Sequence, residues 1–270
     1  MQESETPNNK ETFKTPESSK VPPLEGFREA YTLQLADTTL ILAQRNSEWC
    51  GHGPILEQDI AITNISLDLL GQARSFYQYA AQLKADGSTE NSLAYLRTER
   101  EFKNCLLVEQ PNGDWGQTIL RQYLYSQFQY LLFEKLQQSN DEQLAAIAAK
   151  AIKETTYHVR WSSEWVIRLG DGTEESHSRM LKAIDELWRY TGEMFEPAEY
   201  ETIVDVTALE ESWTQKVNSI FSEASLIPPS GGGGAAFMQT GGKTGTHTEH
   251  LGFMLTELQY VQRTYPGCEW

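Results

Sequence analysis

The chain has 270 residues, with 22 Lys and Arg against 38 Asp and Glu, so its formal net charge at pH 7 is −16. Hydrophobic residues make up 39% of the sequence and aromatic residues 11%, which is enough apolar volume for a folded core and excludes a chain that is disordered throughout. The negative charge argues against nucleic acid or an anionic membrane surface as a partner, because both carry charge of the same sign.

Cysteine usage and the start of the chain bound its environment. Cys50, Cys105 and Cys268 are far apart in the sequence, a pattern typical of neither a disulfide framework nor a zinc site. Residues 1–26 are polar and contain no apolar run of the kind found in signal peptides, so they predict a disordered tail. No later segment has the roughly 20 apolar residues needed to span a bilayer. We therefore expect a soluble, cytoplasmic protein.

Apolar residues recur at helical spacing after residue 27. Taken in chain order, this spacing predicts four long helices over about residues 28–45, 55–83, 115–131 and 139–169. Shorter helices are expected at about 90–107, 181–195, 207–224 and 246–265, with a Gly- and Pro-rich connector at 227–246. Neither an alternating strand pattern nor an internal repeat is visible. The fold class predicted for residues 27–270 is therefore a single all-α domain, a bundle of four long antiparallel helices with shorter C-terminal helices.

Three segments of the form Ser/Thr-x-x-Glu have the pattern of helix capping boxes. They begin at Ser139, Thr207 and Thr246. We expect them to start the fourth long helix, the sixth helix and the last helix, respectively.

The glycine-rich segment near the C-terminus has two features that suggest ligands. Gly242-Lys243-Thr244 ends like a phosphate-binding loop, but the glycine required five residues earlier is Phe237 and no strand precedes it. We interpret this segment as a flexible or partner-wrapping connector. His247 and His250 lie at a helix entrance, where their side chains should diverge, which disfavours a metal site. Our interpretation is a candidate partner-contact segment comprising Lys243, His247, His250 and Trp270.

The long helices carry part of the pattern of a di-iron protein. A carboxylate-bridged di-iron bundle takes Glu from two helices and Glu-x-x-His from the other two, because residues three apart share a helix face. On the second helix Asp68 occupies the carboxylate position, and its i+3 residue is Gly71. On the fourth helix the corresponding residues are Glu154 and Tyr157, with His158 about 100° further round the helix. Both histidine positions therefore lack an imidazole, and we expect neither bound metal nor catalytic residues in this chain.

Three interpretations of the chain remain open. In the first, Asp68, Gln72, Glu154 and His158 form a buried polar network that holds the helices in register. In the second, the chain is a divergent metal-dependent oxidase that uses Glu48, Asp68, Glu154 and His158. In the third, it is an acyl-CoA binding module, since local cations can bind an anion despite the net charge. The candidate cations are Arg74, Lys103, Arg121 and Lys243.

Long motifs along the chain are informative beyond these patterns. They are EWCGHGP at residues 48–54, LDLLGQAR at 67–74, LLVEQPNG at 106–113, KAIKE with YH at 150–158, and the segment 241–252. In these motifs the chain resembles the C-subunit family (PaaC) of phenylacetyl-CoA epoxidases. The resemblance covers residues 31–270, and the N-terminal tail and the four glycines at 231–234 depart from it.

The resemblance implies a ferritin-like fold without a working metal centre and a structural role beside a catalytic A subunit (PaaA-like) that holds the di-iron site. It further implies a small B subunit and a reductase with flavin and an iron–sulfur cluster. Such a complex uses NADPH and O2 to epoxidise the ring of phenylacetyl-CoA in aerobic phenylacetate breakdown. On this resemblance we expect no cofactor in this chain, and contact with phenylacetyl-CoA only through the complex.

Overall fold

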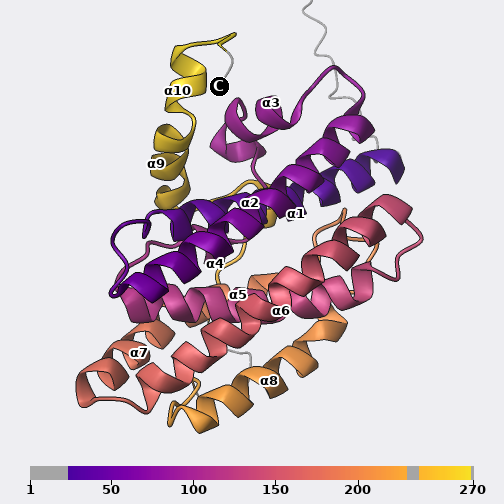
Figure 1. Cartoon of the computed structure of the whole chain (residues 1–270). Coiled ribbons are helices and arrows are strands. Elements are labelled where there is room, and N and C mark those ends of the chain that lie inside the picture. The colour runs from indigo at the N-terminus through magenta and orange to yellow at the C-terminus, as the bar shows by residue number, and fades with distance from the viewer. Residues whose placement is uncertain (1–23, 230–236, 269–270) are drawn as a thin grey trace, which may run out of the picture.

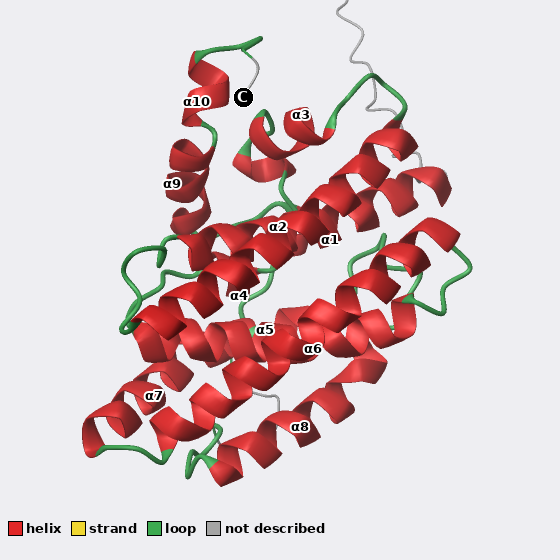
Figure 2. Ribbon diagram, in the orientation of Figure 1, coloured by secondary structure: helices red, strands yellow, loops and turns green. Residues whose placement is uncertain are grey.

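The computed structural model describes residues 24–229 and 237–268. Regular structure in these residues is entirely helical, with no strand (Figure 2), and the predicted all-α fold class is confirmed. None of the described helices is both long and apolar enough to cross a membrane. Residues 1–23 of the predicted N-terminal tail, the four glycines at 231–234 and Trp270 lie outside the described residues. The predicted tail is wrong for residues 24–26, which already belong to the first helix.

Four long helices form the bundle. They are α1 (Leu24–Ser47), α2 (Leu56–Lys84), α5 (Trp115–Leu136) and α6 (Glu142–Gly170). α1 packs along α2 and α5 packs along α6, and each pair is antiparallel because a connection of only a few residues joins its members. The two pairs lie against each other, with contacts between α2 and α6 (Figure 1).

Shorter helices cover the bundle. They are α3 (Glu90–Tyr95), α4 (Leu106–Glu109), α7 (Glu174–Leu187), α8 (Glu210–Glu223), α9 (Glu249–Leu258) and α10 (Tyr260–Thr264). α7 and α8 pack against α5 and α6, whereas α9 and α10 lie at the other side of the molecule, beyond α1 and α2 (Figure 1). The helix predicted over 181–195 is observed as α7, which ends earlier, at Leu187, and two 3-10 turns follow it.

α1 is enclosed on all sides. Every residue from 31 to 43 is buried, which requires that polar groups on this helix find partners inside the protein. Thr38 Oγ1 donates to the Gln34 carbonyl at 2.8 Å, and the Asp37 carboxylate accepts the Tyr77 hydroxyl at 2.6 Å. The sequence of this helix is therefore not amphipathic, because the helix has no solvent face along this stretch.

The two helix pairs are joined by tryptophans at one end of the bundle. The Trp115 ring, at the start of α5, packs edge-on against Trp49 at 5.1 Å and against Trp161 of α6 at 6.1 Å between ring centroids. Trp49 Nε1 also donates to Thr118 Oγ1 at 2.9 Å. These contacts favour a core role for the tryptophans, because edge-on aromatic pairs add to the stabilisation from burial.

The three predicted capping boxes are wrong. α6 begins after Asp141, whose carboxylate caps it, and Ser139 lies before that cap. Ahead of α8, the Asp205 carboxylate accepts the backbone N–H of Thr207 at 3.1 Å. α9 follows Thr248 without a side-chain cap. In the first two cases a nearby Asp accepts the backbone N–H instead, and in the third the N-cap lies two residues after the predicted one. The Ser/Thr-x-x-Glu pattern by itself does not show which residue caps the helix.

Candidate functional site

A line of polar side chains crosses the bundle from α5 through α2 to α6. Gln129 Nε2 donates to Gln72 Oε1 at 3.2 Å, and Gln72 Nε2 donates to Glu154 Oε2 at 2.9 Å. Gln129 and Gln72 are buried, and Glu154 is half-buried. The line connects three helices through paired amide and carboxylate groups, which fixes how far each helix can slide along the others.

Beside it, the imidazole of His158 on α6 meets a carboxylate of α2. His158 Nε2 lies 3.1 Å from Asp68 Oδ2. His158 is fully buried, whereas Asp68 lies at the edge of the α2–α6 contact. His158 Nδ1 is buried and makes no hydrogen bond within the described residues. Asp68 with His158 and Gln72 with Glu154 are thus two neighbouring pairs between α2 and α6.

The expected i, i+3 pairs face the wrong way. Gly71 lies on the exposed side of α2, where an added Cβ would meet no atom within 4 Å, and Tyr157 is also exposed. The pair that points inward on α6 is Thr155 with His158, both fully buried. The expected pairs are one residue out of step with the inward face, and one residue turns a helix by about 100°. A histidine at Gly71 or Tyr157 would therefore lie outside the bundle.

The inward positions do not form a metal ligand set. On α2 the inward pair is Leu69 with Gln72, so neither α2 nor α6 offers a carboxylate three residues before an inward imidazole. Within residues 24–229 and 237–268, no three His, Cys, Asp or Glu side chains are placed so that they could hold a metal ion. Glu48, the fourth ligand of the oxidase hypothesis, is bound instead to Arg45 Nη1 at 3.0 Å and Asn112 Nδ2 at 2.7 Å.

The contribution of α5 to this centre was not predicted from the sequence. Gln122, Ser126 and Gln129 follow one another at steps of four and three residues and are all buried. Gln122 Oε1 accepts Asn46 Nδ2 of α1 at 2.6 Å, and its Nε2 donates to Ser126 Oγ at 2.7 Å. The available signal was this polar stripe on a helix whose other residues are mostly apolar or aromatic.

The four cations proposed for an acyl-CoA pocket have separate partners. Arg121 is fully buried and donates to the Gln110 carbonyl at 2.7 Å; burial and the neighbouring Arg45 lower its pKa to about 9. Lys243 is buried against a carboxylate, as described below. Two more are engaged nearer the surface. Arg74 Nε binds Glu90 Oε1 at 2.8 Å, and Lys103 Nζ lies 5.0 Å from the centre of the Tyr200 ring.

The segment around Lys243 is held inside the protein. Lys243 Nζ lies 2.8 Å from Glu201 Oε2, and both side chains are buried. Glu193 Oε1 accepts the backbone N–H of Gly241 at 2.8 Å, and a Cβ on Gly242 would lie 2.3 Å from the Asn104 carbonyl oxygen. The expectation of a flexible connector is therefore wrong for residues 241–244, which the body of the protein clamps in place.

His247 is also held inside the chain. Its Nδ1 lies 2.8 Å from Glu109 Oε2 and its Nε2 lies 3.0 Å from the Phe102 carbonyl oxygen. A carboxylate and a carbonyl only accept, so both ring nitrogens must donate, which requires an imidazolium. Burial opposes that charge, but the hydrogen bond and attraction from Glu109 outweigh burial and raise the pKa of His247. The side chains of Lys243 and His247 are thus not available to a partner, while His250 is half-buried.

Stability is expected to fall as the pH rises through the pKa of His247. Because the folded pKa is raised above the unfolded value of about 6.5, this contribution is complete below that pH and is lost as the pH passes the folded pKa. Urea unfolding from about pH 6 to about pH 9 should show the advantage of wild type over His247→Gln shrinking with pH. An advantage that stays constant over this range would contradict the assignment.

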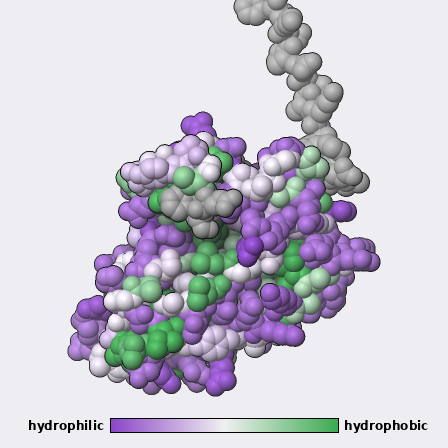
Figure 3. All heavy atoms as spheres, turned by 45° about the horizontal axis from the view of Figure 1, so that its top comes forward, coloured by the Kyte–Doolittle hydropathy of each residue, from purple (hydrophilic) through white to green (hydrophobic). Residues whose placement is uncertain are grey.

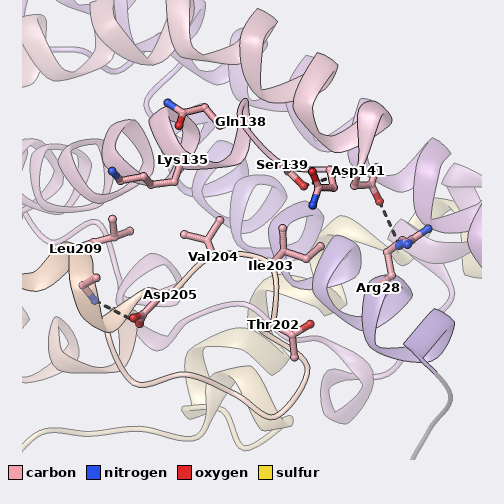
Figure 4. Close-up of a pocket in the computed structure, with 12 residues that line it drawn as sticks. Arg28, Lys135, Gln138, Ser139, Asp141, Thr202, Ile203, Val204, Asp205 and Leu209 are labelled. Atoms are coloured by element: carbon pink, nitrogen blue, oxygen red, sulfur yellow. Dashed lines mark hydrogen bonds and ion pairs between the residues drawn. The ribbon is translucent and has the colours of Figure 1, made fainter.

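An open cavity of about 610 Å³ lies between the α5–α6 turn and the segment 202–209 (Figure 4). Ile203 and Val204 line it, with Lys135 opposite, and Arg28 Nε pairs with Asp141 Oδ2 at 3.2 Å on one side. Asp141 precedes Glu154 by 13 residues of α6, or about 20 Å along the helix. This cavity is therefore separate from the polar centre of the bundle.

The fold is a ferritin-like helical bundle whose inward residues on α2 and α6 do not form the Glu-x-x-His pairs of a di-iron site. The sequence matches the family model described as phenylacetic acid catabolic protein over residues 26–270. It is also 50% identical over 248 residues to the C subunit of 1,2-phenylacetyl-CoA epoxidase from Escherichia coli (strain K12), an alignment that covers 89% of this chain and 98% of that protein. The chain belongs to the phenylacetic acid catabolic protein family, and the resemblance seen in the sequence is confirmed.

Proposed function

We propose that this chain is the non-catalytic, structural C subunit of a phenylacetyl-CoA epoxidase and that it pairs with the di-iron catalytic A subunit. The relative at 50% identity is named as the C subunit of such an enzyme. The observation that carries the non-catalytic role is the inward pair Thr155 and His158 on α6, facing Leu69 and Gln72 on α2. A carboxylate-bridged iron pair needs two Glu-x-x-His pairs, and these four residues contain no carboxylate.

The polar network gives this pseudo-enzyme a physical role. The hydrogen bonds Gln129–Gln72–Glu154 link α5, α2 and α6. These hydrogen bonds favour one alignment of the three helices, because sliding one helix along another would break them. The chain thereby offers its partner a rigid helical surface. The oxygen chemistry and the binding of the substrate ester are carried out by other subunits of the hetero-oligomer, which also contains the small B subunit and the reductase.

Metal analysis of the purified chain and of its complex with the catalytic subunit tests this proposal. We expect iron to be far below one ion per molecule in this chain alone, and about two ions per catalytic subunit in the complex. The matched variant His158→Gln should leave the iron content of the complex unchanged. Stoichiometric iron in the isolated chain that disappears in His158→Gln would instead identify a divergent oxidase.

A further inference from the structure

The helix α2 carries a second hydrophobic stripe that the chain itself does not cover. Its inner face is buried in the core, yet Leu56 and Leu67 on the opposite side are 72% and 60% exposed. Ile60 and Leu70 are exposed on the same side. On the face drawn in Figure 3 the surface is largely hydrophilic, with hydrophobic side chains gathered in separate patches. Four large aliphatic side chains along one outer helix face are a typical feature of a protein-contact surface.

The spacing of the residues in this stripe indicates that its partner is a helix. Leu56, Ile60, Thr63, Leu67 and Leu70 follow one another at steps of four, three, four and three residues. This is the alternation of a coiled-coil seam, in which one helix packs lengthwise on another. From Leu56 to Leu70 there are 14 residue steps, or about 21 Å, which corresponds to two heptads.

Gly71, at the end of the stripe, is a second and independent observation. It lies inside a 29-residue helix, where glycine is less favourable than alanine by about 1 kcal/mol. Within the described residues nothing explains it, because a Cβ there would meet no atom within 4 Å. A side chain at this position is therefore compatible with this chain, and a close approach by another backbone is the remaining physical reason for its absence.

The charge around the stripe favours a basic partner over a second copy. Glu57 is exposed next to Leu56, whereas Asp68 and Glu154 are half-buried and already paired with His158 and Gln72. Arg74, the cation that follows the stripe, is already paired with Glu90. Two copies of this chain would bring together two net charges of −16, which opposes self-association.

We propose that the outer stripe of α2, formed by Leu56, Ile60, Thr63, Leu67 and Leu70 beside Gly71, docks an amphipathic helix of the catalytic subunit. That helix has apolar residues at the same spacing and Lys or Arg beside them. This inference rests on the proposed function, since the partner is the catalytic subunit. It adds the surface, the helix-on-helix geometry and the charge of the opposing residues.

Binding of purified catalytic subunit to variants of this chain tests the proposal. Leu67→Lys is expected to weaken binding by about 30-fold or more, because it places a charge at the centre of an apolar contact. The matched control is Leu181→Lys on α7, which replaces another exposed leucine and should change binding by less than about 3-fold. Both positions are exposed, so both variants should keep the helical spectrum and thermal midpoint of wild type.

Gly71 provides a second measurement. Gly71→Gln should leave the isolated chain as stable as wild type or more so, because nothing surrounds the position, yet it should weaken the complex by about 10-fold or more. Equal binding by wild type, Leu67→Lys and Gly71→Gln would overturn the docking surface and leave the proposed function standing. Absence of any complex with wild type would overturn both. A dimer of this chain alone that Leu67→Lys dissociates would show that the occupant is a second copy, and would also overturn the proposal.

Discussion

Replacing Lys243 by methionine is expected to lower the free energy of unfolding by about 3–5 kcal/mol. The side chains of Lys243 and Glu201 are 4% and 2% exposed, with Nζ and Oε2 only 2.8 Å apart. Lys243→Met leaves the Glu201 carboxylate in the interior with the backbone N–H of Ala198, at 2.8 Å, as its other hydrogen-bond donor. An unpaired buried charge is unfavourable because the interior solvates it poorly.

The double variant Lys243→Met with Glu201→Leu separates the charge effect from packing. Removing both charges leaves no uncompensated ion, so the double variant should be more stable than Lys243→Met alone. Urea unfolding followed by circular dichroism measures all three proteins. A loss below about 1 kcal/mol for Lys243→Met would show that water reaches this pair and that residues 241–244 are not clamped as described.

Asp37→Asn is the second change expected to have a large effect, with a loss of about 3–5 kcal/mol. The Asp37 carboxylate binds the guanidinium of Arg97 through both oxygens and accepts the backbone N–H of Lys103 at 2.9 Å. Arg97 in turn donates to the carbonyls of Leu93 and Glu101, at 2.6 and 2.8 Å. The variant leaves a nearly buried guanidinium without its counter-ion, so the segment that contains α3 should loosen from α1.

Differential scanning calorimetry should show this loss as a fall in the unfolding midpoint of about 10 °C, since about 1 kcal/mol corresponds to about 2–4 °C for a chain of this size. The matched control is Glu90→Gln, which breaks the more exposed pair with Arg74 and should cost less than about 1 kcal/mol. If both variants shift the midpoint equally, the Asp37–Arg97 pair is better solvated than its burial indicates.

The pattern of helices was available from the sequence because it depends on neighbours within one or two turns. The second long helix is expected over residues 55–83 and is observed as Leu56–Lys84. The turn before α5 ends at Asp114, which accepts the backbone N–H of Gln117 at 3.0 Å. Apolar periodicity and turn residues act locally, so they mark a helix without knowledge of its partners.

Apolar periodicity did not predict which residues of α2 and α6 face the centre of the bundle. The expected inward residues Gly71 and Tyr157 are exposed, and Gln72 and His158 take the inward positions. Apolar periodicity fixes the buried face of a helix only to within about one residue, or about 100°. Predicting metal ligands requires the orientation of each helix to within less than one residue, because the residue next to an inward position can point into solvent.

The sequence by itself determined the helical class of this protein, the extent of its long helices and the family to which it belongs. Only the tertiary structure decided that Lys243 pairs with Glu201 and His247 with Glu109, and that Gln129 joins the polar centre. The physical reason is the length scale of the interactions. Helix formation is set by contacts a few residues apart, whereas a buried charge is placed by a partner 42 or 138 residues away, brought to it by the packing of the whole bundle.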